Sequence, residues 1–277
     1  MAGKLMNLSN EYEEEEPSQP LNPNNMLNND WCRGVIRPPE SVRSQLKCFH
    51  LNTTFIPFLR LTRIKVEEMY KRPHIVVIHE FLSEFEIQIL KAWATPGLER
   101  TQVVNDTTGA YIPSKDRLAF GNWIKDEQHS AMATISRRIS AITGLDLSTA
   151  EDANIIRYGV GGYYGHHYDT DVYVVDNPVI KPKRIATWIN YLSDVEAGGA
   201  TVFPYINVAV WPEKGAGLFW YNMLTSGLID VNTIHGGCPV LVGTKWIVTK
   251  WIRPTGQEFR KLCENNLLSY NVLGINS

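Results

Sequence analysis

The sequence predicts a mainly β protein with flanking helices, whose core is a β-sandwich or a jelly-roll barrel. Short apolar runs rich in β-branched and aromatic residues follow one another after Asn154, and glycines and prolines separate most of them. Two stretches with helical periodicity precede these runs. The chain has 277 residues, enough for one large domain, and its hydrophobic content of 44% is typical of a globular protein.

The first 30 residues predict a disordered acidic tail. They contain four consecutive glutamates, three prolines, many asparagines and almost no aromatic residues, so they have little apolar surface to bury. We expect order to begin near Trp31. Residues 31–277 would form the functional domain, with helical support over about 31–150 and the jelly-roll core over about 151–260.

One strand and two helices are expected before the core. Residues 74–79 are a short β-branched run that is typical of a strand. Ser83 precedes Glu86 and a series of apolar residues at helical spacing, which predicts a helix capped by that serine. A second helix is expected over residues 128–143, and Gly144 stands where a glycine commonly ends a helix. Both helices would pack on one outer face.

The core strands are read from six runs, which the intervening glycines and prolines delimit. These runs are residues 154–158, 185–192, 200–203, 208–211, 217–222 and 245–252.

Composition excludes some classes of function. The formal charge is -2 and the pI is about 6.4, so no general electrostatic attraction to nucleic acid is expected. No run of apolar residues is long enough to span a membrane. The N-terminus lacks the apolar region of a signal peptide, which taken by itself indicates the cytosol.

Cysteine spacing leaves the redox state open. There is no C-x-x-C motif, and four cysteines allow three pairings or four free thiols. The three N-x-[ST] sequons, at Asn7, Asn52 and Asn105, weakly favour a secretory location. The cysteines are Cys32, Cys48, Cys238 and Cys263.

A candidate metal site lies in the segment around His167. On an extended strand, side chains two residues apart share a face, so His167 and Asp169 would lie together while His166 points away. His235, at the start of a later strand, would supply a second imidazole. Two histidines and one carboxylate leave three coordination positions open, which is the arrangement of non-heme iron(II) oxygenases. A bidentate 2-oxo acid and O2 would take those positions.

Lys245 is the candidate partner for the cosubstrate. It lies ten residues after His235, inside an otherwise apolar strand. A buried ammonium without an anionic partner is very costly, and the distal carboxylate of 2-oxoglutarate would supply that partner.

Each of these residues also has an ordinary interpretation. An isolated H-x-D occurs often by chance, His166 is a competing ligand, and Lys245 could face solvent on an edge strand. The combined pattern is much more specific than its parts. Two rival functions, a non-catalytic jelly-roll binding subunit and a zinc hydrolase, are disfavoured by the complete triad and by the lack of a base or nucleophile arranged near it.

Longer strings of residues resemble the catalytic domain of the collagen prolyl 4-hydroxylase α subunit. The resemblance runs from about Cys32 to Cys263 and is dense after residue 145. The strings that carry it are Arg157-Tyr-Gly-Val-Gly-Gly-Tyr, His167-Tyr-Asp169, Arg184-Ile-Ala-Thr-Trp, Ser193-Asp-Val-Glu-Ala-Gly-Gly-Ala-Thr-Val-Phe-Pro204, Val210-Trp-Pro, Phe219-Trp-Tyr-Asn222, His235-Gly-Gly-Cys-Pro-Val-Leu-Val-Gly-Thr-Lys245-Trp and Gly256-Gln-Glu-Phe-Arg260.

This resemblance implies a double-stranded β-helix (jelly-roll) fold and 4-hydroxylation of proline in X-Pro-Gly sequences of procollagen or collagen-like proteins. It implies Fe(II), 2-oxoglutarate, O2 and L-ascorbate as cofactors and cosubstrates. By motif, the triad would hold iron and Lys245 the 2-oxoglutarate carboxylate. Tyr158, Thr201 and Trp251 would line the cosubstrate pocket.

The resemblance also implies a cellular setting. It indicates the lumen of the endoplasmic reticulum, protein disulfide isomerase as a β subunit, and local disulfides Cys32–Cys48 and Cys238–Cys263. The sequence departs from the family in three ways. It shows no counterpart of the N-terminal dimerisation and peptide-binding regions, it shows no signal peptide, and His166 and Tyr168 replace the usual proline and phenylalanine. Assembly into a tetramer is therefore left open.

Overall fold

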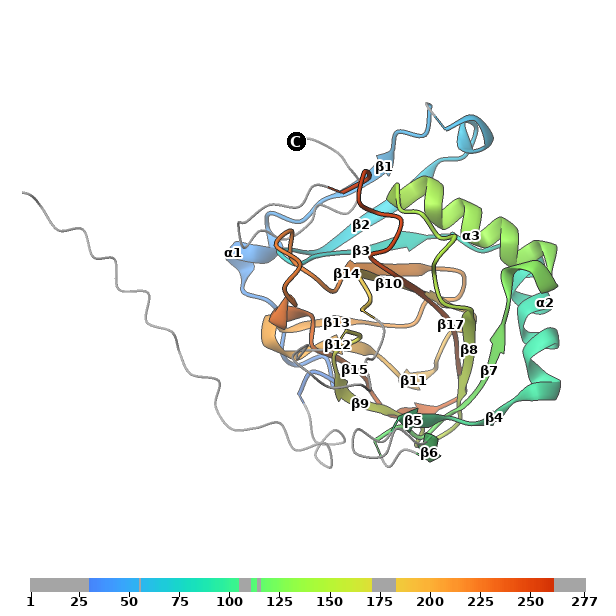
Figure 1. Cartoon of the computed structure of the whole chain (residues 1–277). Coiled ribbons are helices and arrows are strands. Elements are labelled where there is room, and N and C mark those ends of the chain that lie inside the picture. The colour runs from blue at the N-terminus through green and yellow to red at the C-terminus, as the bar shows by residue number, and fades with distance from the viewer. Residues whose placement is uncertain (1–29, 55, 105–110, 114–115, 171–182, 262–277) are drawn as a thin grey trace, which may run out of the picture.

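The computed structural model describes residues 30–261, apart from 55, 105–110, 114–115 and 171–182. Two antiparallel β-sheets face each other and enclose the core (Figure 1). The expected mainly β, jelly-roll fold is confirmed. The acidic tail lies outside the described residues.

The larger sheet has nine strands in the order β1-β2-β3-β14-β10-β17-β8-β7-β4. Its central strands match the expected runs and pair antiparallel with long registers, as where Lys245 of β17 stands opposite Tyr158 of β8. The strands are β1 (Cys48–Leu51), β2 (Ile64–Lys71), β3 (His74–His79), β4 (Glu99–Arg100), β7 (Phe120–Ile124), β8 (Ala153–Tyr158), β10 (Ala186–Tyr191), β14 (Gly217–Tyr221) and β17 (Lys245–Ile252).

The smaller sheet has four strands in the order β13-β12-β15-β9, so β9 forms one edge. Two further strand pairs, β11 with β16 and β5 with β6, lie beside the sheets. The strands are β5 (Gln102–Val104), β6 (Tyr111–Pro113), β9 (Tyr164–His167), β11 (Ala197–Gly198), β12 (Thr201–Phe203), β13 (Val208–Val210), β15 (His235–Gly237) and β16 (Val240–Val242).

Two long helices cover the outer face of the larger sheet, as expected (Figure 1). Helix α2 begins after Ser83, whose hydroxyl accepts from the backbone N–H of Glu86 while the Glu86 carboxylate accepts from the backbone N–H of Ser83. Helix α3 ends at Gly144, which adopts φ +71°. The helices and 3-10 turns are α1 (Glu40–Arg43), η2 (Pro57–Leu59), α2 (Glu84–Ala94), η3 (Thr95–Gly97), η4 (Asp126–Gln128), α3 (Ser130–Thr143), η5 (Pro204–Ile206) and η6 (Val231–Thr233).

The two-residue alternation of the strands divides the core into two layers. On β3, Val76 and Ile78 pack under the helices, whereas Ile75 and Val77 face the inside of the barrel. Trp188 and Ile189 of β10 divide in the same way. This double burial explains why the central strands are apolar at almost every position, and why a polar residue among them needs a reason.

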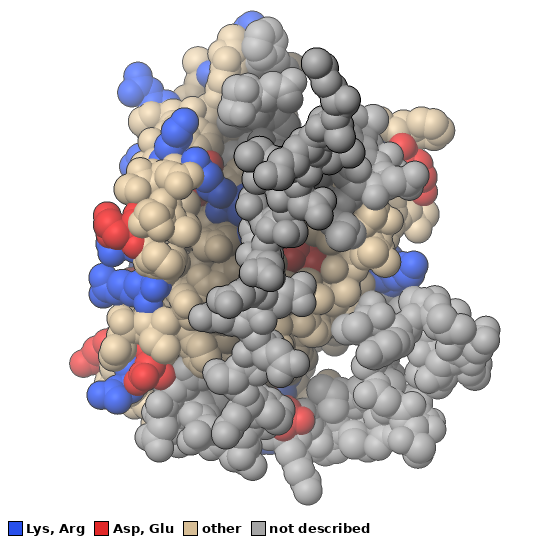
Figure 2. Space-filling model, turned by 90° about the vertical axis from the view of Figure 1, so that its left-hand side faces the viewer, with Lys and Arg blue, Asp and Glu red and all other residues tan. Residues whose placement is uncertain are grey.

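Residues before position 150 contribute more than helices. They supply strands β1, β2, β3, β4 and β7 to the larger sheet. Within the described residues, no helix combines the length and apolarity that crossing a membrane requires. On the face shown in Figure 2, basic and acidic side chains alternate along one edge, with uncharged surface between them.

The cysteine pairing differs from the expectation. Cys32 is bonded to Cys238, and Cys48 is free and exposed. The expected Cys32–Cys48 and Cys238–Cys263 pairs are therefore wrong for this structure, and Cys263 lies outside the described residues. The physical reason is that the N-terminal segment packs against the smaller sheet, where the Trp31 indole N–H donates to Asn207 Oδ1 over 2.8 Å.

Candidate iron and cosubstrate site

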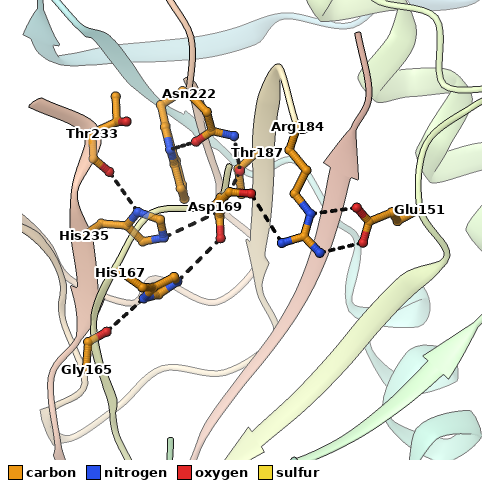
Figure 3. A network of polar contacts seen from close by, with 10 residues as sticks. Glu151, Gly165, His167, Asp169, Arg184, Thr187, Asn222, Thr233 and His235 are labelled. Atoms are coloured by element: carbon orange, nitrogen blue, oxygen red, sulfur yellow. Dashed lines mark hydrogen bonds and ion pairs between the residues drawn. The ribbon is translucent and has the colours of Figure 1, made fainter. Parts of the chain in front are cut away.

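Three expected ligands converge inside the barrel. His167 ends β9, Asp169 follows two residues later, and His235 begins β15, whose first residue stands opposite His167. Their ligand atoms all lie within 4.8 Å of one another. The Nε2 atom of His167 is 3.5 Å from Asp169 Oδ1, and that of His235 is 3.6 Å from Asp169 Oδ2 (Figure 3).

Backbone carbonyls fix both imidazole rings. His167 Nδ1 lies 2.8 Å from the carbonyl oxygen of Gly165, and His235 Nδ1 lies 2.9 Å from that of Thr233. Because a carbonyl oxygen only accepts, each Nδ1 carries a proton, which leaves Nε2 as the ring atom that could bind a metal. Burial, with the neighbouring His167 acting in the same direction, lowers the pKa of His235 to about 4, which keeps its ring neutral.

The carboxylate of Asp169 is ionised despite its burial. Burial raises its pKa, but the adjacent His235 and His167, together with Arg184, lower it more, and the net pKa lies well below the usual range. Two imidazoles and one carboxylate on one side of a shared space are the donors that a divalent iron ion requires. The donor set therefore fits Fe(II).

A chain of buried hydrogen bonds orients Asp169 (Figure 3). The Thr187 hydroxyl donates to Asp169 Oδ2 over 2.6 Å. The Asn222 amide donates to Thr187 Oγ1 over 2.9 Å, and the Trp220 indole donates to Asn222 Oδ1 over 2.8 Å. This chain fixes which lone pairs of the carboxylate face the space between the imidazoles.

Arg184 lies next to Asp169 and contacts both Glu151 and Trp251. Its guanidinium forms two hydrogen bonds with Glu151, of 2.6 and 2.7 Å, and lies 4.0 Å from the Trp251 ring centroid (Figure 3). No individual role for Arg184, Thr187 or Asn222 was predicted from the sequence. A usable signal was present, since Thr187 and Asn222 are polar residues at 0% and 1% exposure within apolar runs.

Lys245 lies in the same cavity as the triad. Its side chain is 3% exposed, and no carboxylate among the described residues lies within salt-bridge distance of its amine. Its Nζ is 5.6 Å from the Tyr158 ring centroid and 5.7 Å from that of Tyr191. Desolvation lowers its pKa to about 7. A buried amine without a partner, opening on a metal site, suits a ligand with a free carboxylate.

The remaining expected site residues also line this cavity. Tyr158, Thr201 and Trp251 are all buried there. The Thr201 hydroxyl is 2.8 Å from the Tyr191 hydroxyl. His166, the competing ligand, takes the opposite side of β9 and meets Trp31 edge-on, with ring centroids 6.5 Å apart.

The fold and site together define a class of protein. A double-stranded β-helix that carries two histidines and an aspartate inside the barrel, with a buried cation nearby, is the arrangement of an iron- and 2-oxo-acid-dependent oxygenase. Residues 153–253, which contain the triad and Lys245, match the model of the 2OG-Fe(II) oxygenase superfamily.

Curated relatives place the chain near one branch of this family. It is 40% identical to prolyl 4-hydroxylase subunit alpha-1 of Homo sapiens over 84% of this chain and 44% of the relative. It is 38% identical to prolyl 4-hydroxylase subunit alpha-2 of Gallus gallus over the same shares of each protein. The chain thus spans less than half the length of these relatives.

A solved structure supports the same grouping. The viral collagen prolyl hydroxylase from Paramecium Bursaria Chlorella virus-1, in complex with 2OG, superposes with a TM-score of 0.53 at 28% sequence identity. The match covers 64% of this chain and 94% of the viral chain.

Proposed function

We propose that this chain is a prolyl 4-hydroxylase that acts on X-Pro-Gly sequences of procollagen or collagen-like proteins. One observation carries the proposal: the triad of His167, Asp169 and His235 shares a cavity with the unpaired amine of Lys245. The similarity to prolyl 4-hydroxylase α subunits supports proline as the target. Residues 31–277 would form the catalytic domain.

The chemistry of the bound Fe(II) would be O2 activation, coupled to conversion of 2-oxoglutarate into succinate and CO2 and to insertion of one oxygen atom into a C–H bond of proline. The protein residues provide position and charge. His167, Asp169 and His235 would hold the ion, and a set of three protein ligands would leave coordination positions for 2-oxoglutarate and O2.

Lys245 would bind the distal carboxylate of 2-oxoglutarate. Its Nζ lies beside Tyr158 and Tyr191 on the inner face of the larger sheet, and the backbone of Gly237 leaves room for that amine. The hydroxyl of Thr201 lies on the same wall and would donate to the same carboxylate. A cation and a hydroxyl directed at one carboxylate distinguish a dicarboxylate from a monocarboxylate.

The substrate proline would enter between Tyr164 and Trp251. Both rings line the cavity, Tyr164 stacks on His167 at 3.7 Å, and Trp251 is held by Arg184. Flat apolar walls suit a proline ring and exclude water from the target C–H bond.

We further propose L-ascorbate as the reductant, the lumen of the endoplasmic reticulum as the location and protein disulfide isomerase as a partner subunit. The resemblance to collagen prolyl 4-hydroxylases supports these three points, and the oxidised Cys32–Cys238 pair is compatible with an oxidising compartment. Asn52, in one of the three sequons, is exposed, as glycosylation would require.

The test is mass spectrometry of (Pro-Pro-Gly)-repeat peptides incubated with the protein, Fe(II), 2-oxoglutarate and ascorbate. The proposal expects each modified peptide to gain the mass of oxygen on proline preceding glycine, and expects this gain to vanish when iron or 2-oxoglutarate is omitted. Peptides that remain unmodified in the complete mixture would refute prolyl hydroxylation.

A further inference from the structure

A second buried cation, Arg117, lies at the edge of the same cavity. Its side chain is 6% exposed and lines the cavity. Its guanidinium carbon is 4.5 Å from the centroid of the Tyr164 ring, and the same ring stacks on His167. The guanidinium, the phenol ring and the ligand imidazole thus form a series of contacts that ends at the candidate metal site.

The backbone fixes the position of Arg117. The segment that carries it pairs with β9 through an isolated bridge between Arg117 and Tyr164. Hydrogen bonds flank the bridge on both sides: the N–H of Leu118 donates to the Tyr163 carbonyl over 2.9 Å, and the N–H of Gly165 donates to the Asp116 carbonyl over 2.7 Å. Arg117 is therefore attached to the edge strand of the smaller sheet and is not carried on a free loop.

The charge of Arg117 has no counter-charge in the described part of the chain. A guanidinium stays protonated in proteins, yet no described carboxylate lies within salt-bridge distance, and its Nε is buried without an acceptor. Arg184 offers a contrast, because Glu151 neutralises it through two hydrogen bonds. The stack on Tyr164 compensates only part of the desolvation of Arg117. Its donors are therefore suited to a negatively charged ligand.

Lys245 and Arg117 are placed for different ligands. Lys245 lies on a central strand of the larger sheet, between two tyrosine rings. Arg117 lies beside β9, the edge of the smaller sheet. A small dicarboxylate held by the metal and by Lys245 leaves Arg117 without a partner, whereas a polypeptide crossing the sheet edge would pass it.

We propose that Arg117 is a substrate-recognition residue that binds the carboxylate of an aspartate or glutamate next to the target proline. This inference rests on the proposed function. One aromatic ring separates Arg117 from the ligand His167. Consecutive residues of an extended peptide are about 3.3–3.6 Å apart, so a carboxylate at this place belongs to an immediate neighbour of the proline.

The experiment compares two collagen-like peptides that differ only by Glu or Gln beside the target proline. For wild type, Arg117→Gln and Arg117→Lys, KM and kcat are measured with both peptides, and the Michaelis constant for the cosubstrate 2-oxoglutarate is measured as well. Wild type is expected to show a KM about tenfold or more lower for the Glu peptide, since the contact is a charge-assisted hydrogen bond. Arg117→Gln should abolish this preference, and Arg117→Lys should retain part of it.

Arg157→Gln is the matched control. Its guanidinium also stacks on aromatic rings, 5.9 Å from the centroids of Phe120 and Trp246, but it is exposed and outside the cavity. This variant should keep the full preference for the Glu peptide.

Three outcomes would overturn the proposal. If the wild type has the same KM for the Glu and the Gln peptide, Arg117 does not bind a carboxylate beside the target proline. If KM rises equally for both peptides in Arg117→Gln, Arg117 only positions Tyr164. If only the Michaelis constant for 2-oxoglutarate rises, Arg117 binds the cosubstrate and not the peptide. Equilibrium binding of fluorescent versions of the two peptides reports the same preference without turnover. A charge-dependent affinity without hydroxylation would thus refute the proposed function while supporting this inference.

Discussion

At the residue scale, the site depends on where protons and lone pairs are fixed. The backbone carbonyls of Gly165 and Thr233 select the tautomers of the two histidines, and the Thr187 hydroxyl occupies one oxygen of Asp169. Strand alternation was enough to separate His167 from His166 in the sequence. The pairing of Thr187 with Asp169 was not predictable, because the two residues lie 18 positions apart and only the fold brings them together.

Replacing Thr187 by Val should weaken metal binding while preserving the fold. The change keeps the shape but removes the donor to Asp169 and leaves the Asn222 amide without its acceptor. Loss of such a partner typically costs about 10–100-fold in metal affinity. Titration of metal-free protein with Co(II) measures the effect, and Thr187→Ser should restore most of the affinity. Unchanged Co(II) binding in Thr187→Val would show that the chain of hydrogen bonds does not position Asp169.

The affinity for 2-oxoglutarate should fall as the pH rises above 7. Desolvation lowers the pKa of Lys245 to about 7 in the empty site, whereas the bound dicarboxylate favours the charged amine. Binding therefore takes up a proton above that pH, and affinity should be roughly tenfold lower at pH 8 than at pH 6. The same linkage affects the stability of the protein without 2-oxoglutarate. Between pH 7 and the unfolded pKa of lysine, the unfolded chain binds the proton that folding releases, so the free energy of unfolding should rise with pH.

Calorimetric titration of the metal-loaded protein with 2-oxoglutarate, in buffers of different ionisation enthalpy, measures both affinity and proton uptake. Lys245→Arg carries a charge at every pH in this range, so its affinity should be almost independent of pH. A pH-independent affinity in the wild type would remove Lys245 from the cosubstrate site.

At the scale of elements, local sequence signals predicted the long strands and both helices. The capping serine, the terminal glycine of α3 and the β-branched runs act over a few residues, so they can be read directly from the sequence. The short strands β1, β4, β5, β6 and β11 have two to four residues each, too few to show an alternating pattern. The segment before residue 74 likewise showed few clear periods.

Comparing substitutions at two glycines that have the same φ distinguishes backbone strain from steric overlap. Gly198 in β11 and Gly227 both adopt φ +80°, but a Cβ at Gly198 would overlap the Pro239 carbonyl oxygen, whereas a Cβ at Gly227 would meet nothing within 4 Å. Gly227→Ala should cost about 1–2 kcal/mol of unfolding free energy, because an L side chain is disfavoured at positive φ. Gly198→Ala should cost clearly more, because the β11–β16 pair must also separate. Chemical denaturation of both variants measures this, and equal losses would contradict the predicted contact.

At the scale of the whole molecule, the sequence predicted the jelly-roll and the location of its site. It did not predict that a disulfide joins the N-terminal segment to the smaller sheet. Cysteine spacing left three pairings open. The local pairs were expected only because the family resemblance implies them. The packing of Trp31 and Cys32 on the smaller sheet is a long-range feature, since the bonded cysteines are 206 positions apart in the sequence. No local pattern encodes such a contact.

The Cys32–Cys238 bond should appear in peptide maps of oxidised protein. Digestion without reduction should recover one peptide pair that contains both residues, with Cys48 open to alkylation. Cys32→Ser should lower the unfolding free energy by roughly 2–5 kcal/mol, and Cys48→Ser, on an exposed strand, serves as the control. Recovery of Cys32 joined to Cys48 would contradict this arrangement.

The central claim is that His167, Asp169 and His235 hold the metal, and the two adjacent histidines of β9 test it most directly. Anaerobic titration with Fe(II) should show that His167→Ala loses about 10-fold or more in affinity, as removing a ligand should do at least as much as removing its partner. His166→Ala should bind like the wild type, because its ring faces Trp31 on the other side of the strand. The reverse result, with His166→Ala deficient and His167→Ala unaffected, would contradict the account.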